Sequence, residues 1–256
     1  MTTSNAQLIE LYAKQLRLPA IGDWKSIVRE ATEQHWGYED FLCAVLQREI
    51  EQRQENQRKY RIKTACFPKI KTIDSFDFKW LRNVKATVVY ELATGKFIEE
   101  KRPVLMFGNP GTGKTHLAIA LAYQLCCAGY KAFFRTAGQL VTDLAEASAQ
   151  GRLAALQAKL AKFDLLVVDE LSYITFGRSS AELLFQAISN RYELGSTIVT
   201  TNLPFSRWTE LFGDATLTTA LVDRLTHRSI ILDMNGESYR LYETRQQKSD
   251  EKKDKD

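Results

Sequence analysis

Over the first sixty positions, apolar residues recur at steps of three and four, the spacing of one face of an α-helix. The pattern predicts helices over 8–16, 24–31 and 38–60, with interruptions that include Pro19 and Gly37. Polar residues occur on every side of the second half of the longest of these helices. This is typical of a helix that bridges solvent or binds a partner.

From about residue 80 onward, helical patterns alternate with short apolar runs that end in turn residues. A helix is expected over 80–93, with Gly95 as its stop signal. Helices that alternate with buried strands predict an α/β fold built on a parallel, doubly wound sheet. The expected strands are 104–107, 131–135, 165–169, 197–202 and 229–233.

These patterns divide the chain into three parts. Residues 1–68 are expected to form a small, all-helical N-terminal domain for assembly and for DNA or partner binding. Residues 69–245 are expected to form the α/β domain. The tail, 246–256, consists almost entirely of alternating charges and is expected to be disordered.

A glycine-rich turn separates the first expected strand from the helix after it, with the sequence Gly108-Asn109-Pro110-Gly111-Thr112-Gly113-Lys114-Thr115. Between a strand and a helix, this motif predicts a phosphate-binding loop. Gly111 and Gly113 allow backbone angles at which successive N–H groups point at phosphate oxygens, and the helix N-terminus adds its positive dipole end. Lys114 is expected to contact the β- and γ-phosphates, and the Thr115 hydroxyl to bind Mg²⁺. The chain is therefore predicted to bind a nucleotide.

Two adjacent carboxylates follow the apolar run 165–168. Asp169, at the end of the strand, suits Mg²⁺ through its water shell, and Glu170 suits a general base that activates the attacking water. Asn202 ends the fourth strand, and it could position that water if the fourth strand lies between the first and the third. A hydrolase requires such a base, whereas a small-molecule kinase can dispense with it.

An arginine-containing stretch, Asp223-Arg224-Leu225-Thr226-His227-Arg228, precedes the fifth strand. An arginine here could reach the γ-phosphate of a neighbouring subunit and stabilise charge in the transition state. The alternative is an ion pair with Asp223 or a plain surface charge. Residue types alone do not choose between Arg224 and Arg228.

A basic stretch with interleaved aromatics spans 58–71 and contains no acidic residue. Its charge suggests contact with a nucleic-acid backbone, and a solvated linker is the alternative. The candidate DNA-binding residues are Arg58, Lys59, Arg61, Lys63, Lys69 and Lys71.

Composition narrows the class of protein further. The chain has 256 residues, 45% hydrophobic and 26% charged, with a formal net charge of +4. No window is apolar enough to span a membrane, and the N-terminus lacks the pattern of a secretory signal. The four cysteines show no metal-ligand spacing, which favours reduced thiols over a zinc site or disulfides. The expectation is a cytoplasmic protein.

The motifs together resemble the AAA+ ATPases, and more narrowly the IstB family, the ATP-dependent transposition helpers of IS21-type insertion sequences and kin of the helicase loader DnaC. Beyond the phosphate-binding loop with His116, the resemblance rests on several stretches. These are Ala65-Cys66-Phe67-Pro68, Phe76-Asp77-Phe78, Val168-Asp169-Glu170-Leu171, Thr200-Thr201-Asn202-Leu203-Pro204-Phe205, Asp223-Arg224-Leu225 and Gly236-Glu237-Ser238-Tyr239-Arg240.

The resemblance implies an initiator-type AAA+ fold and an oligomer joined through ATP-bridged interfaces, with ATP and Mg²⁺ as cofactors. It implies that residues 108–116 hold the nucleotide and that Arg224 is the finger. Double-stranded DNA and an IstA-type transposase are the implied partners. A helical insertion is expected near 138–162, with Arg152, Lys159 and Lys162 as further DNA candidates. The 23 residues after Asp233 are too few for a C-terminal lid, and the choice between Arg228 and Arg240 as a nucleotide sensor stays open.

The expected function is an ATPase that binds and remodels target DNA and recruits a transposase. A helicase loader keeps the same chemistry with another partner. A P-loop kinase is disfavoured by Glu170 and Asn202. A clamp that binds ATP without hydrolysing it stays open, because finger and base can be present while turnover is slow.

Overall fold

The computed structural model of the chain describes residues 5–78, 80–81, 83–172, 177–192 and 194–242. Contacts divide the chain into two units, Met1–Tyr60 and Arg61–Asp256, and each is described by itself. The boundary lies earlier than residue 68, where the sequence predicts it. The expectation of a disordered tail over 246–256 falls outside the described residues.

The N-terminal unit contains helices, as its periodicity predicts. Its elements are α1 (Asn5–Gln15), a 3-10 helix η1 (Pro19–Asp23), α2 (Trp24–Glu33) and α3 (Tyr38–Thr64), which continues past the division. The long helix therefore ends four residues after its predicted end at residue 60, at Thr64.

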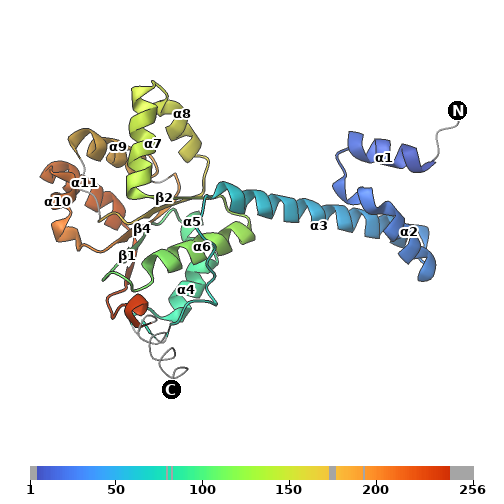
Figure 1. Cartoon of the computed structure of the whole chain (residues 1–256), viewed down its shortest axis with the longest axis horizontal. Helices are drawn as coiled ribbons and strands as arrows, with labels where there is room; N and C mark the ends of the chain where they lie inside the picture. The colour runs from blue at the N-terminus through green and yellow to red at the C-terminus, as the bar shows by residue number, and fades with distance from the viewer. Residues whose placement is uncertain (1–4, 79, 82, 173–176, 193, 243–256) are drawn as a thin grey trace, which may run out of the picture. The chain divides into compact units, whose positions relative to one another are not determined.

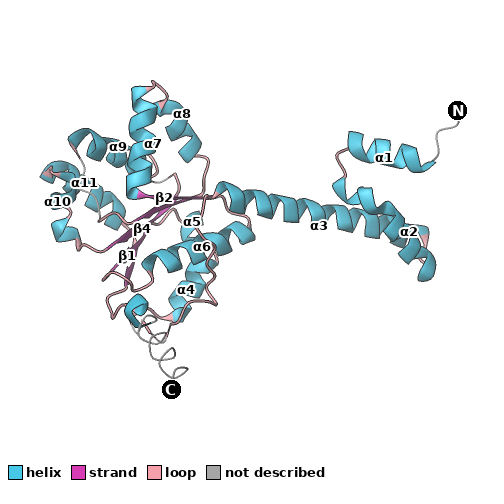
Figure 2. Cartoon of the chain, viewed as in Figure 1, coloured by secondary structure: helices cyan, strands magenta, loops and turns pink. Residues whose placement is uncertain are grey.

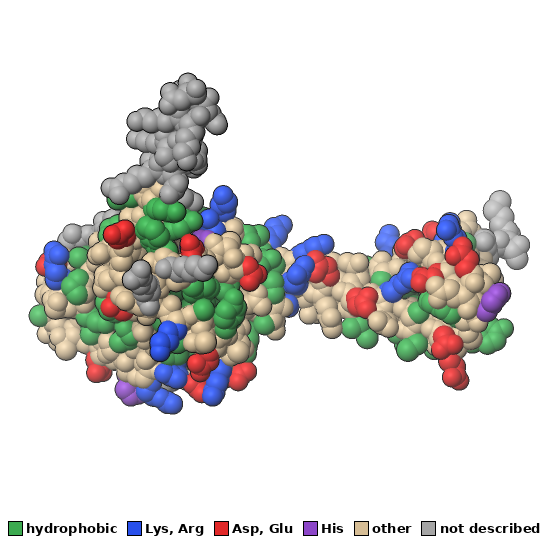
Figure 3. All heavy atoms as spheres, turned by 90° about the horizontal axis from the view of Figure 1, so that it is seen from below, with side chains coloured by type: hydrophobic (Ala, Val, Ile, Leu, Met, Phe, Trp, Pro, Cys, Tyr) green, Lys and Arg blue, Asp and Glu red, His purple; other side chains and the backbone are tan. Residues whose placement is uncertain are grey.

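Few side chains are buried within the described part of this unit. Ala13 and Ile27 are buried apolar residues, and Glu49 is a buried charged residue. The Glu49 carboxylate accepts a hydrogen bond from the Ala20 N–H at 3.0 Å and pairs with Arg53 Nε at 2.6 Å. Figure 3 shows hydrophobic side chains among charged ones at the surface of this unit. The exposed large apolar residues include Leu11, Tyr12, Leu16, Leu42, Leu46 and Ile50.

The second unit is built on a five-stranded sheet in which every strand pair is parallel. Figure 2 shows the strands lying among helices. The strand order is β2-β3-β4-β1-β5. Both faces of such a sheet are covered, so its inner strands β3 and β4 are buried along their whole length. The strands are β1 (Val104–Phe107), β2 (Ala132–Thr136), β3 (Leu165–Asp169), β4 (Ser196–Thr201) and β5 (Ile230–Asp233).

Successive side chains of each strand enter different cores, since a strand turns alternate residues to opposite faces. Val167 of β3 belongs to the first core, whereas Val168 belongs to the second core, on the other face of the sheet. Helices cover both faces (Figure 1). The helices of the first face are α4 (Ala86–Ala93), α5 (Lys96–Glu99) and α6 (Lys114–Ala128). The second core contains residues of α7 (Ala137–Ala149), α8 (Leu153–Leu160), α9 (Arg178–Ser189), α10 (Thr209–Phe212) and α11 (Ala215–Thr226), and a 3-10 turn, η2 (Phe205–Arg207), precedes α10.

The expected helix over 80–93 is wrong in its first half, because α4 begins only at Ala86. Leu81 and Val84 are buried in the first core, and the side chains of Trp80 and Asn83 donate hydrogen bonds to backbone carbonyls far along the chain. Tertiary contacts thus hold this segment in turns, against a local helical pattern.

The residues just after the division pack onto the sheet. The Ala65 carbonyl accepts a hydrogen bond from the N–H of Phe134 in edge strand β2 at 2.8 Å, and Arg61 Nε donates to the Cys126 carbonyl at 2.8 Å. All four cysteines are free thiols. Among the described helices, none combines the length and apolar character needed to cross a bilayer.

Candidate nucleotide site

The glycine-rich turn joins β1 to α6, as the motif predicts. Gly111 has φ +80° and Gly113 has φ +94°, in the region that favours glycine, and α6 begins directly after Gly113. The free N–H groups of a helix N-terminus and of such a turn attract anions. The loop therefore offers a binding site for phosphate groups at the carboxyl end of the inner strand β1.

Lys114 is the buried cation of this phosphate-binding site, and the residue is only 7% exposed. Its Nζ donates hydrogen bonds to the carbonyls of Gly108 and Asn109, both at 2.7 Å. Burial lowers the pKa of Lys114 to about 8, against the opposing attraction of Asp169. A phosphate group would supply the negative charge that this ammonium lacks.

A cluster of oxygens lies beside the lysine. The Asp169 carboxylate is buried and accepts hydrogen bonds on Oδ1 from the hydroxyls of Thr115 at 3.0 Å and Thr200 at 2.5 Å. Burial raises the pKa of Asp169, and the two hydroxyl hydrogen bonds oppose that rise.

These oxygens fit a magnesium ion. Mg²⁺ prefers hard oxygen ligands and takes only one or two from the protein, with waters and substrate phosphates completing its shell. Thr115 Oγ1 and Asp169 Oδ1 offer such a pair. Among the described residues, no group of three or more His, Cys, Asp or Glu side chains could hold a metal. Thr115 and Asp169 would supply the protein ligands, and waters and nucleotide phosphates would complete the shell.

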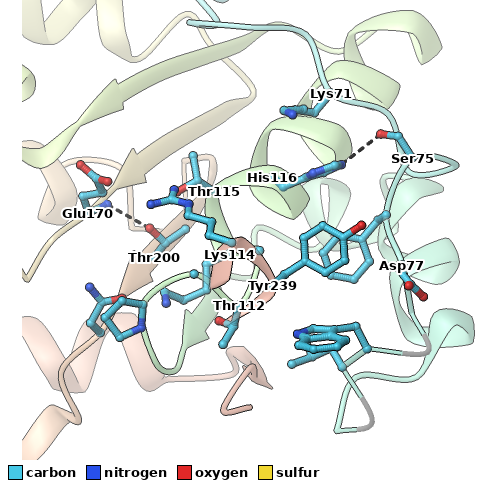
Figure 4. A pocket seen from close by; sticks show the side chains of 18 of the residues that line it. Lys71, Ser75, Asp77, Thr112, Lys114, Thr115, His116, Glu170, Thr200 and Tyr239 are labelled. Atoms are coloured by element: carbon cyan, nitrogen blue, oxygen red, sulfur yellow. Dashed lines mark hydrogen bonds between the residues drawn. The ribbon is translucent and has the colours of Figure 1, made fainter. Parts of the chain in front are cut away.

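Glu170 directly follows β3 and is exposed. Its backbone is left-handed, with φ +59°, and its N–H donates a hydrogen bond to Thr200 Oγ1 at 2.9 Å (Figure 4). Asn202 directly follows β4, and its N–H donates to Ser172 Oγ at 2.9 Å. The condition for Asn202 is met, because β4 lies between β1 and β3. Glu170 and Asn202 line one cleft with the phosphate-binding loop.

The cleft has a volume of about 390 Å³ and an aromatic wall that the sequence analysis did not assign. Phe76, Trp80 and Tyr239 line it, and the rings of Trp80 and Tyr239 meet edge to face at 5.7 Å. Aromatic rings beside a phosphate-binding loop offer a surface on which a nucleobase can stack. Phe76 and Tyr239 lie in sequence motifs that resemble the IstB family, and this likeness is the only sign of the wall in the sequence.

A segment after β5, residues 234–242, covers the phosphate-binding loop, and we call it the C-terminal strap. The Tyr239 N–H donates to the Gly111 carbonyl at 3.0 Å, and Asn109 Nδ2 donates to the Gly236 carbonyl at 3.3 Å. A side chain at Gly108, where φ is +153°, would collide with the backbone of Met234. Glycine at this position thus permits the close packing of strap and loop.

The two sensor candidates lie in different places. Arg240, on the strap, lines the cleft. Burial is the main cause of the lowered pKa of Lys114, and the positive charge of Arg240 lowers that pKa further, whereas Asp169 opposes the change. Arg228 is exposed, and its carbonyl accepts a hydrogen bond from Arg102 Nε at 2.8 Å. The geometry favours Arg240 over Arg228 as the cation near a bound nucleotide.

His116 lines the cleft, yet its ring is engaged by the segment before α4. Its Nε2 lies 3.1 Å from Ser75 Oγ and 3.3 Å from the Thr72 carbonyl, and its ring meets that of Phe76 edge to face at 5.5 Å. Burial lowers the pKa of His116. This geometry supports a role in holding Phe76, and the nucleotide contact of His116 stays a prediction.

Arg224 lies away from the cleft of its own chain. It sits in the last turn of α11, where Nη1 donates to the Ala220 carbonyl at 3.1 Å and the guanidinium stacks over Phe185 at 5.1 Å. It shares a shallow hollow with Pro103 and Thr197, where β1 and β4 begin. The phosphate-binding loop lies at the opposite, carboxyl end of β1. Any contact between Arg224 and a γ-phosphate would therefore be made with another subunit.

The DNA candidates have varied surroundings. Arg58 and Lys59 pair with Glu55 at 2.8 and 3.6 Å, and Lys71 lines the cleft. Lys63 and Lys69 are exposed. In the expected insertion, which forms α7 and α8, Arg152 hydrogen-bonds to Gln150, Lys159 lies 5.9 Å from the centre of the Phe133 ring, and Lys162 is exposed. No contact of these residues with DNA is tested by the structure.

Comparison with known proteins places these features in a family context. The profile of the IstB-like ATP binding proteins matches residues 11–248. An ATP-binding protein of insertion sequence IS5376 from Geobacillus stearothermophilus is 40% identical over 245 residues, covering 95% of this chain and 98% of that protein. An ATP-binding protein of insertion sequence IS21 from Pseudomonas aeruginosa is 39% identical, covering 86% of this chain and 83% of that protein.

Solved structures resemble the fold. AMPPCP-bound DnaA from Aquifex aeolicus superposes with a TM-score of 0.55 at 18% identity, over 66% of this chain and half of that one. The DnaC helicase loader superposes with a TM-score of 0.50 at 22% identity, over 57% of this chain and 86% of that one. The predicted fold class, a P-loop AAA+ domain of the initiator and helicase-loader type, is confirmed.

Proposed function

Because this chain belongs to the family of IstB-like ATP binding proteins, we propose that it is an ATP-hydrolysing helper of DNA transposition. In this proposal, ATP joins copies of the chain into an oligomer on double-stranded DNA. The oligomer remodels the target and recruits an IstA-type transposase, and hydrolysis ends that state. One observation carries the proposal: Lys114, Thr115 and Glu170 line a single cleft, and Thr115 is hydrogen-bonded to the buried Asp169 carboxylate.

The chemistry follows from these groups. The loop amides and Lys114 bind the β- and γ-phosphates. A Mg²⁺ ion held by Thr115 and Asp169 would neutralise phosphate charge. Glu170 accepts a proton from water as the water oxygen attacks the γ-phosphorus and the bond to the β-phosphate oxygen breaks, which yields ADP and phosphate. Asn202 orients the same water.

The position of Arg224 supports assembly. Since it lies across the sheet from its own cleft, the arginine that stabilises the transition state comes from the neighbouring subunit. Hydrolysis is then coupled to assembly, because an isolated copy lacks this charge.

The DNA and transposase partners rest on family membership, since relatives are named for insertion sequences. The exposed Lys63 and Lys69 supply charge suited to a phosphate backbone. The second candidate is a helicase loader, which the likeness in fold to DnaC favours. The two functions share one ATP site and differ only in the protein that they recruit.

Size-exclusion chromatography with light scattering tests the proposal on the full chain. With duplex DNA and ATP, the complex should grow into a large oligomer, and ADP or no nucleotide should leave smaller species. Exchanging Lys63 and Lys69 together for glutamate should weaken DNA binding, whereas Arg178→Glu on α9 serves as a control for charge alone. A species indifferent to both ATP and DNA would refute the proposal. Binding a replicative helicase in preference to a transposase would favour the loader.

A further inference from the structure

We infer that Thr200 is a positioning residue for ATP hydrolysis, whose single hydroxyl holds the carboxylate of Asp169 and the backbone of Glu170 in fixed relation. The inference rests on the proposed hydrolysis. Thr200 lies in β4, two positions before Asn202. In the proposed chemistry Thr200 does not contact the attacking water.

The register of the sheet brings these groups together. Val168 of β3 lies opposite Val199 of β4. The next residues, Asp169 in β3 and Thr200 in β4, are therefore also neighbours. Alternation turns Asp169 and Thr200 to the face that carries α6, the same face as Val167 and Ile198. Thr115 approaches from the first turn of α6 on that face.

The Thr200 hydroxyl donates one hydrogen bond and accepts another. The hydroxyl donates to Asp169 Oδ1 at 2.5 Å and accepts the N–H of Glu170 at 2.9 Å, with the residue 1% exposed. Figure 4 shows the second of these bonds at the margin of the cleft. A hydroxyl used as donor and acceptor at once has one orientation, so the two acidic residues are fixed relative to each other.

The backbone of Glu170 explains why such a bond is needed. With φ +59°, Glu170 occupies a conformation that residues other than glycine rarely adopt. Such strain persists where surrounding contacts hold it, and the N–H bond to Thr200 is such a contact, together with the bond from the Leu171 N–H to the Thr200 carbonyl at 3.0 Å. The left-handed turn directs the Glu170 side chain away from the strand line, where it borders the cleft.

Thr200→Val tests this role, because it removes the hydroxyl with little change of shape. Turnover of ATP should fall about tenfold to hundredfold, the cost of a hydrogen bond to a charged group. ATP affinity should stay within about twofold, since Lys114 and the loop amides are untouched. Thr200→Ser should restore turnover. Ser196→Ala removes another buried hydroxyl, at the opposite end of the same strand, and as the control it should leave turnover unchanged.

Hydrogen exchange gives a readout that does not depend on turnover. In the nucleotide-free protein, the Glu170 amide should exchange at least about tenfold faster in Thr200→Val than in wild type, since its acceptor is gone. If the valine variant fails to fold, Thr200→Ala serves the same comparison.

The outcomes separate this inference from the proposed function. Loss of turnover with ATP affinity retained, rescue by serine and faster exchange would support the role of Thr200. Wild-type turnover in Thr200→Val, or equal losses of turnover and affinity, would overturn it alone. A wild-type protein that does not hydrolyse ATP under assembly conditions would refute the proposed function and this inference with it.

Discussion

ATP binding should be accompanied by proton uptake at mildly alkaline pH, because Lys114 is a buried ammonium without a full counter-charge. Burial lowers its pKa to about 8 in the nucleotide-free protein. The phosphates of bound ATP favour the charged form and raise that pKa. ATP therefore binds the protonated lysine, and its affinity should fall as pH rises through 8.

The size of the effect follows from the titration of a single group. At pH 8, about half of the free protein carries the proton on Lys114, so binding should take up about half a proton. The uptake should approach about 0.9 at pH 9 and fall to about 0.1 at pH 7. Above pH 8, the affinity should fall by up to about tenfold for each pH unit. His116 adds nothing here, because its pKa lies below the usual 6.5.

Isothermal titration calorimetry measures this uptake directly. Binding heats at pH 8 and 9, with saturating Mg²⁺, are compared in buffers of different ionisation enthalpy. In the control variant Lys114→Arg, the guanidinium keeps its charge throughout this range, so any remaining binding should show no buffer dependence. Binding by the wild-type protein without proton uptake at both pH values would show that Lys114 is fully charged in the free protein, and the reasoning from its burial would be refuted.

Three further outcomes are expected. Glu170→Gln should bind ATP and accumulate as the assembled form, with phosphate release at least about a hundredfold slower, and turnover at the wild-type rate would exclude Glu170 as the base. Arg224→Ala should hydrolyse poorly alone but recover activity when mixed with Lys114→Ala subunits, and no recovery at any ratio would contradict a finger supplied between subunits. Trp80→Ala should weaken ATP binding about tenfold to a hundredfold by removing a stacking ring, while competition by inorganic triphosphate stays unchanged. An equal loss for triphosphate would show that Trp80 does not contact the base.

The sheet and the phosphate loop were predictable from local patterns. The observed strand Val104–Phe107 matches the expected one, and the others agree within one residue at each end. Each strand has β-branched or aromatic residues at its centre or is a continuous apolar run, which made it recognisable. The loop could be recognised because its glycines, its lysine and its flanking elements are contiguous in sequence. The residues around Asp169 followed from its place at the end of a buried strand.

Features that depend on distant contacts could not be predicted in this way. The turns before α4 look helical in sequence, but Trp80 Nε1 donates to the Glu237 carbonyl at 2.8 Å, and no local pattern reports that bond. The aromatic wall combines residues from before and after the sheet, so its members share no spacing. The role of Thr200 required the register between β3 and β4, which the sequence does not specify.

The bond between Trp80 and Glu237 spans 157 positions of the chain. One wall of the cleft is therefore synthesised before the strands of the sheet and the other only after all five of them. A ribosome-bound chain that has not yet released the strap has a glycine-rich loop but no closed cleft. Contacts of such long range also form slowly, since the intervening chain must first be ordered. The closed cleft therefore forms only in a chain whose sheet is already complete.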